Sequence, residues 1–158
     1  IAGVVSSYAI VPNPELRKRF FAFMEANELD NASIFSSVVT MAAYKHGADW
    51  RRQMLRYVES NIAYVDKYLK RNIPCVKAML PQASFLIWLD CSGLGLCQDK
   101  LVKFLEKKAH LFMNDGTMFG PEGAGFMRLN IACPRSVLTT ALEQLKDAVA
   151  GLKCSCKR

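Results

Sequence analysis

The chain has 158 residues, of which 51% are hydrophobic and 22% are charged, and it carries a formal net charge of +7. This balance excludes a disordered protein and is typical of one globular domain or of parts of two. Its lysines and arginines are dispersed along helical stretches and do not alternate with aromatic residues, and no apolar run is long enough to span a bilayer, so we expect neither nucleic acid nor a membrane as a partner.

The first third of the chain predicts one strand and two helices. Residues 4–11 form an apolar run typical of a buried strand. A helix is predicted over residues 14–26 with Asn13 as its N-cap. A second helix, capped by Asn31 or Ser33, is predicted to continue to Lys45. These elements hold too little apolar surface to close a core alone. We therefore expect residues 1–48 to be the C-terminal remnant of a larger α/β domain.

A long helix is predicted over residues 49–72, and Pro74 prevents it from continuing. Apolar residues recur in it at spacings of three and four, which gives one continuous stripe: Leu55, Val58, Ile62, Val65 and Leu69. A helix of this length spans roughly 30 Å. Because helices of this length often join two domains, we expect it to link the remnant to the C-terminal half of the chain.

The last part of the chain, residues 73–152, predicts a small α+β domain with helices on one face of a sheet, so the fold class is α/β overall. A flexible basic tail is expected over residues 153–158. The predicted elements are strands over 75–79, 84–90, 111–113 and 126–132, a turn over 114–116, and helices over 98–109 and 136–151.

A glycine-rich loop, Gly120–Gly125, runs directly into the strand predicted over 126–132. Side chains alternate across a strand, so Met127 and its alternate neighbours form a core face, while Arg128 and Asn130 point the other way. A guanidinium matches a carboxylate or a phosphate with two parallel hydrogen bonds.

Two interpretations of Arg128 stay open from the residues alone. It is either a solvent-facing arginine on an edge strand, as many arginines are, or the group that holds a substrate anion in a cleft. In the second case Gly123 and Gly125 would let the loop backbone approach the anion closely.

Six cysteines are scattered through the chain: Cys75, Cys91, Cys97, Cys133, Cys154 and Cys156. Their spacing gives no Cys-x-x-Cys pair, and the two histidines lie far apart in sequence, so we expect no metal site. Thiols inside apolar runs indicate reduced cysteines, and together with the lack of a signal-peptide pattern they favour a cytoplasmic protein.

Three stretches resemble a known family: Ser84–Asp90, Asn114–Gly120 and Gly125–Ala132, the last followed by Cys-Pro-Arg. Over nearly its whole length the chain resembles the C-terminal portion of fold-type-I pyridoxal-phosphate enzymes, aminotransferase class I/II. It is most similar to the cystathionine β-lyase type of carbon–sulfur lyase.

The resemblance implies roles for two residues of the chain. The family's arginine on this strand grips the α-carboxylate of the amino acid substrate, which carries onto Arg128, and Asn130 matches a position near the same cleft with a supporting role. Ile1-Ala2-Gly3 resembles the end of the stretch that comes after the family's Schiff-base lysine. We therefore expect this chain to be a fragment, with the Schiff-base lysine before Ile1. We expect no catalytic residue in the chain, and we expect the chain to be inactive alone.

The activity that the resemblance implies is cleavage of a thioether amino acid to pyruvate, ammonia and a thiol, with pyridoxal 5′-phosphate as cofactor. An aminotransferase is the alternative within enzymes, and a regulatory protein-binding domain is the alternative of another class. Many class I aminotransferases place a phosphate-binding arginine where this chain has Val5, and that difference favours the lyase. The resemblance also implies a homodimer, in which residues 30–36 would belong to a loop near the partner subunit.

Overall fold

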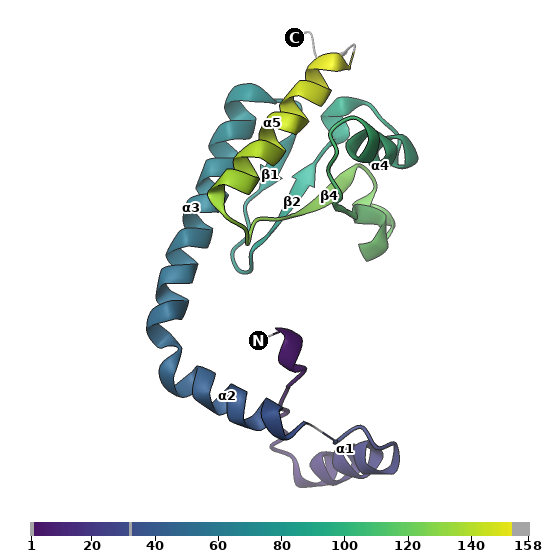
Figure 1. Ribbon diagram of the computed structural model, residues 1–158. Coiled ribbons are helices and arrows are strands. Elements are labelled where there is room, and N and C mark those ends of the chain that lie inside the picture. The colour runs from purple at the N-terminus through teal and green to yellow at the C-terminus, as the bar shows by residue number, and fades with distance from the viewer. Residues whose placement is uncertain (1, 32, 153–158) are drawn as a thin grey trace. The chain divides into compact units, whose positions relative to one another are not determined.

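The computed structural model describes residues 2–31 and 33–152, and the predictions made for Ile1 and for the tail with Cys154 and Cys156 lie outside them (Figure 1). The chain divides into two compact units, Ile1–Gln53 and Met54–Arg158, and the division falls inside the longest helix, α3 (Ala48–Asn72). That α3 links two domains with the boundaries expected above stays a prediction.

The first unit contains a short 3-10 helix, η1 (Ala2–Val4), and the helices α1 (Pro14–Ala26) and α2 (Ile34–His46). Both α-helices are confirmed. Asn13 caps α1, because its side-chain oxygen accepts a hydrogen bond of 3.0 Å from the backbone N–H of Leu16. Ser36 is the buried residue of α2, and its hydroxyl donates to the carbonyl of Val4 at 2.9 Å.

The strand predicted over residues 4–11 is wrong. After η1 the backbone is irregular up to α1, and Val5, Tyr8 and Ile10 are 87%, 72% and 82% exposed. A strand exists only where a neighbouring backbone completes its hydrogen bonds, and no described segment pairs with this stretch. An apolar run alone is therefore not sufficient to predict a strand.

The second unit is built on a four-stranded antiparallel sheet with the order β1-β2-β4-β3. Its strands are β1 (Lys77–Met79), β2 (Leu86–Asp90), β3 (Asn114–Asp115) and β4 (Phe126–Asn130). The strand predicted over 111–113 is wrong, and so is the turn at 114–116. Pairing with β4 moves the strand to Asn114–Asp115, and a 3-10 helix, η3 (Gly116–Phe119), comes directly after it.

Three helices cover one face of the sheet, which confirms the predicted α+β arrangement: α3, α4 (Gln98–Lys107) and α5 (Arg135–Gly151). Figure 1 shows α3 and α5 side by side, and the hydroxyls of Tyr64 and Thr139 join them at 3.1 Å. The residues buried between these helices and the sheet include Val65, Leu69, Ile87, Leu89, Leu101, Leu105, Met127, Leu138, Leu142 and Leu145. Among the described residues no helix is both long and apolar enough to cross a membrane.

A buried amide fixes the corner where β4 turns into α5. Asn61 of α3 is fully buried, and its amide nitrogen donates to the carbonyls of Ile131 at 2.9 Å and Cys133 at 3.2 Å. Its oxygen accepts a hydrogen bond of 2.8 Å from Nε of Arg135. The end of β4 is therefore tied to the long helix by three hydrogen bonds of one side chain.

Candidate functional site

The sheet face opposite the helices carries the arginine singled out in the sequence. Arg128 lies on β4 between two neighbouring strands, with Trp88 of β2 and Asn114 of β3 as its Cα partners. Met127 on the other face is buried, as strand alternation predicts, whereas Arg128 is half-buried. β4 is a central strand here, so the interpretation of Arg128 as an edge-strand residue is wrong.

The guanidinium of Arg128 is held on two sides, and its buried Nε is left without a partner among the described residues. Its Nη2 donates to the side-chain oxygen of Asn114 at 2.8 Å, and its Cζ lies 4.7 Å from the centre of the Phe119 ring. Its Nε is buried and has no hydrogen-bond partner among the described residues. A buried donor left unpaired costs about 1–3 kcal/mol, so this atom is a place where an added acceptor is stabilising.

Aromatic rings form a wall beside the guanidinium. Trp88 stacks on Phe126 with ring centres 5.8 Å apart and meets Phe119 edge-to-face at 5.5 Å. An apolar wall excludes water and lowers the local dielectric constant, which strengthens the attraction between a guanidinium and an anion. The arrangement is chemically suited to binding a single carboxylate or a phosphate oxygen.

The loop that carries Phe119 is folded tightly on itself. A Cβ added to Gly116 would lie 2.2 Å from the carbonyl oxygen of Gly123, and one added to Gly123 would lie 2.0 Å from that of Gly116, so neither position accepts a side chain as the backbone stands. Gly125, at φ +84°, donates its N–H to Oε1 of Gln98 at 2.7 Å. The glycines that the sequence pointed to are thus occupied in shaping the loop.

Gln98, the first residue of α4, joins this loop to the neighbouring strand. Its amide nitrogen donates to the Asp115 carboxylate at 2.6 Å. Burial opposes ionisation of Asp115, but hydrogen bonds from Thr117 and Gln98 outweigh it and hold the pKa of this carboxyl below its usual range. The negative charge of Asp115 is therefore committed to the loop. Gln98 was missed in the sequence, where it is one polar residue at a helix start.

Asn130 shares the face of Arg128 but is used differently. It is exposed, and its side-chain oxygen accepts a hydrogen bond of 2.9 Å from the backbone N–H of Ala132, which closes the turn after β4. Its amide nitrogen has the capacity to donate to a ligand. A role for Asn130 at the site stays a prediction.

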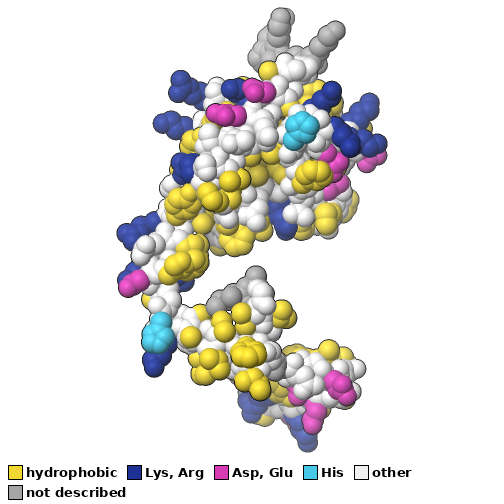
Figure 2. All heavy atoms as spheres, viewed as in Figure 1, with side chains coloured by type: hydrophobic (Ala, Val, Ile, Leu, Met, Phe, Trp, Pro, Cys, Tyr) yellow, Lys and Arg dark blue, Asp and Glu magenta, His cyan; other side chains and the backbone are white. Residues whose placement is uncertain are grey.

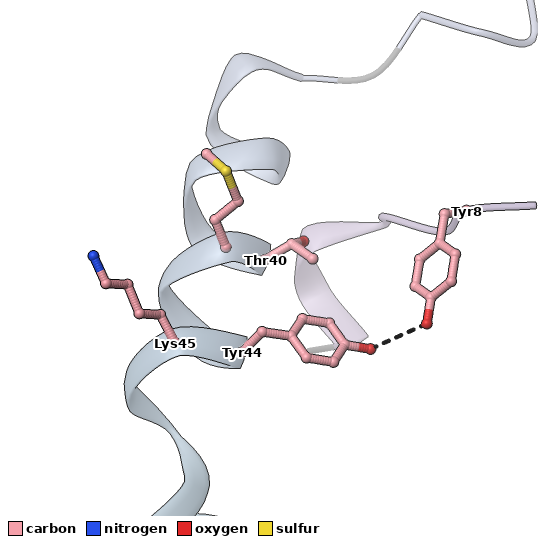
Figure 3. A pocket seen from close by; sticks show the side chains of 5 residues that line it. Tyr8, Thr40, Tyr44 and Lys45 are labelled. Carbon is pink, nitrogen blue, oxygen red and sulfur yellow. Dashed lines mark hydrogen bonds between the residues drawn. The ribbon is translucent and has the colours of Figure 1, made fainter.

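A hollow of about 580 Å³ lies in the first unit and is lined by Tyr8, Thr40, Met41, Tyr44 and Lys45 (Figure 3). The hydroxyls of Tyr8 and Tyr44 are 3.5 Å apart, and this hydrogen bond raises the pKa of Tyr44. Lys45 points away from the two hydroxyls (Figure 3). All five residues are exposed or half-buried, and none of them has a buried unpaired polar atom like Nε of Arg128.

Neither the cysteines nor the acidic residues form a metal site among residues 2–31 and 33–152. Cys91, directly after β2, is buried, and burial together with the neighbouring Asp90 and Cys75 raises the pKa of its thiol to about 12. A thiol with this pKa is neither a nucleophile nor a ligand near neutral pH.

Comparison with known proteins finds relatives along almost the whole chain. Cystathionine beta-lyase PatB of Bacillus subtilis is 37% identical over 150 residues, which are 95% of this chain and 39% of PatB. The crystal structure of a pyridoxal-phosphate-bound putative aminotransferase from Clostridium difficile is 37% identical with a TM-score of 0.90, over 94% of this chain and 38% of that one. Cystalysin from Treponema denticola, whose structure contains pyridoxal 5′-phosphate, is 29% identical with a TM-score of 0.90, over 97% of this chain and 39% of cystalysin.

The chain is a homologue of fold-type-I pyridoxal-phosphate enzymes. The resemblance drawn from Ser84–Asp90, Asn114–Gly120 and Gly125–Ala132 is thereby confirmed, including its similarity to the cystathionine β-lyase type. The chain spans about two fifths of the length of the curated relatives that it matches. No protein-family model matches it.

Proposed function

We propose that this chain is the C-terminal portion of a pyridoxal-phosphate-dependent carbon–sulfur β-lyase, and that Arg128 holds the α-carboxylate of its amino acid substrate. The observation that carries the proposal is the buried, unpaired Nε of Arg128 beside an aromatic wall. The relatives support the reaction class, because PatB is a cystathionine beta-lyase. Asn130, two residues further on the same face, is proposed to support the bound substrate.

The residues of this chain fit the substrate end of such a site better than the cofactor end. A pyridoxal-phosphate site needs a lysine and a phosphate cradle around one pocket. In the hollow lined by Tyr8 and Tyr44, the one lining lysine, Lys45, points away from the two hydroxyls (Figure 3). We therefore propose that the lysine and the phosphate cradle belong to a part of the protein other than residues 1–158, and that these residues alone are inactive.

The contribution of Arg128 to the reaction is orientation. When bound, the cofactor withdraws electrons from the substrate's Cα, which weakens the bond to be broken. Two parallel hydrogen bonds from the guanidinium to the carboxylate fix one end of the substrate, so that the Cα–H bond is presented in one direction.

The proposed protein is a cytoplasmic homodimer that acts on a small amino acid, as the family resemblance implies. The experiment uses residues 1–158 joined to the remaining part that the relatives possess, with pyridoxal phosphate bound. Pyruvate released from cystathionine with no added keto acid supports the lyase. Amino-group transfer that requires a keto acid, without pyruvate from cystathionine, would instead support the aminotransferase, a candidate favoured by the 37% identity to the putative aminotransferase. A protein that takes up no cofactor would contradict both.

A further inference from the structure

The guanidinium of Arg128 is a good anchor only if something holds it still. An arginine side chain has roughly 2 kcal/mol of rotamer entropy, and a mobile one loses that freedom each time it binds an anion. Two side chains of the same unit hold it: Asn114, which accepts from Nη2 at 2.8 Å, and Phe119, whose ring centre lies 4.7 Å from Cζ.

We propose that Asn114 and Phe119 are positioning residues that hold the Arg128 guanidinium in the one orientation that receives the substrate carboxylate. The inference rests on the proposed function, since it takes Arg128 as the carboxylate anchor. It assigns the orientation of that anchor to two residues for which the family resemblance gave no role.

The position of Asn114 is set by the sheet. Its Cα is paired with that of Arg128 across β3 and β4, so the two side chains start from the same face at neighbouring places. Asn114 accepts the hydrogen bond without carrying a charge. The carboxylate of the adjacent Asp115 accepts hydrogen bonds from Thr117 and Gln98. The Cα partner of Asp115 in the sheet is Met127, not Arg128. The guanidinium is thus oriented but not neutralised, and its full charge remains for a ligand.

The position of Phe119 is set by the folded loop. Gly116 and Gly123 pack backbone to backbone, and Gln98 ties Gly125 to the strand carrying Asp115. The ring is also in edge-to-face contact with Trp88 at 5.5 Å. It covers one face of the guanidinium by a cation–π contact. With one face covered by the ring and Nη2 engaged by Asn114, the guanidinium keeps one orientation toward a carboxylate.

The test measures selectivity for a carboxylate in the cofactor-loaded longer protein. L-Alanine and L-alaninol share the amine and the methyl group, but alaninol carries a CH₂OH in place of the carboxylate. The dissociation constant of alaninol divided by that of alanine, both measured by calorimetry, gives the preference of the site for a carboxylate. Asn114→Ala and Phe119→Leu are each expected to reduce this ratio by about 5- to 30-fold.

Matched controls separate positioning from a general loss of structure. Asn72→Ala removes an asparagine that donates to the carbonyl of Tyr68, and Phe112→Leu truncates a ring that is 86% exposed; both should leave the ratio unchanged. Asn114→Asp keeps the shape of the side chain but adds a charge that competes with the substrate, so it should lower the ratio as well. Because the added charge alone lowers the ratio, Phe119→Leu provides the test of positioning if Asn114→Ala does not fold.

The outcomes distinguish this inference from the proposed function. A normal ratio in both Asn114→Ala and Phe119→Leu, with a reduced ratio in Arg128→Ala, overturns the positioning role and leaves Arg128 as the anchor. An unchanged ratio in Arg128→Ala overturns the anchor itself. A reduced ratio in Arg128→Ala and in the two positioning variants, with normal controls, supports both.

Discussion

The substitution Arg128→Ala in the longer, cofactor-loaded protein should remove the partner of the substrate carboxylate without disturbing the core. Met127 and Leu129 hold the core side of β4, so the other face can lose a side chain while the fold persists. Deleting one partner of a shielded charge pair costs roughly 2–5 kcal/mol, so kcat/KM should fall by about 30-fold to several thousand-fold. Arg128→Lys should recover a part, because an ammonium lacks the planar fork.

Steady-state kinetics decide this prediction, with the cofactor absorbance as a control for folding. The absorbance should be normal in both variants, since Arg128 is assigned to the substrate. A change of less than twofold in kcat/KM for Arg128→Ala would show that the arginine is only a surface residue.

The Cys91 thiol should resist alkylation, and its raised pKa should make the free energy of unfolding fall as the pH becomes alkaline. Because its folded pKa is about 12 and an unfolded thiol ionises near 8.5, the stabilisation is complete below about pH 8.5 and is lost as pH rises toward 12. Between pH 9 and 11 the free energy of unfolding should fall more steeply for the native chain than for Cys91→Ala, by about 1 kcal/mol per pH unit. Iodoacetamide at pH 8 should label the exposed Cys97 and spare Cys91. Equal labelling of the two would contradict the buried placement.

At the scale of the elements, the buried amide of Asn61 should matter more to stability than a hydrogen bond at the helix surface. Asn61→Leu leaves two carbonyls and Nε of Arg135 without their partner, so we expect a loss of about 2–4 kcal/mol. Tyr64→Phe removes one hydrogen bond between α3 and α5 but keeps the ring under Arg135, and should cost about 0.5–1.5 kcal/mol. Urea unfolding of both variants gives the comparison, and a smaller loss for Asn61→Leu would refute it.

Elements whose pattern is local were predictable from the sequence. The Asn13 cap and the stripe of α3 gave correct helices, and alternation placed Met127 and Arg128 on opposite faces of β4. Features that depend on partners far away in the sequence could not be predicted from it. The strand at 4–11 lacks a pairing segment among the described residues, and the position of β3 is set by its register with Arg128.

The candidate site divides in the same way. Arg128 stands next to a glycine-rich loop and on an alternating strand, so a local signal pointed to it. Asn61 looks like one polar residue in a helix, and nothing local shows that it meets carbonyls some 70 positions later. The same holds for Asn114 and Phe119, whose contact with Arg128 arises only when the loop folds back.

At the scale of the whole molecule, residues 1–158 alone should neither bind pyridoxal phosphate covalently nor turn over an amino acid. The family resemblance implies a Schiff-base lysine outside this chain, and Lys45 of the Tyr8–Tyr44 hollow points away from the two hydroxyls (Figure 3). Incubation with the cofactor, borohydride reduction and mass measurement test this. Stoichiometric labelling of one specific lysine would disprove it.

The first unit should make the 158-residue chain self-associate. Ser36 is buried in α2, whereas Ile34, Val38 and Met41 on one face of that helix are 83%, 57% and 66% exposed, and Figure 2 shows hydrophobic side chains gathered over α2. Soluble monomers seldom expose a large contiguous apolar patch. Burying such a surface against a second copy is favourable by roughly 25 cal/mol per Å², so association should strengthen with concentration.

Sedimentation velocity across a range of concentrations tests this association. The double substitution Ile34→Ser with Val38→Ser should shift the chain toward monomer, because it removes apolar area from one face of α2 and places no polar group in a core. Phe112→Ser, which also removes an exposed apolar side chain but lies in the second unit, should leave association unchanged. An equal effect of the two substitutions would mean that association is unspecific, and a monomeric native chain at every concentration would mean that this face of α2 is stable in water.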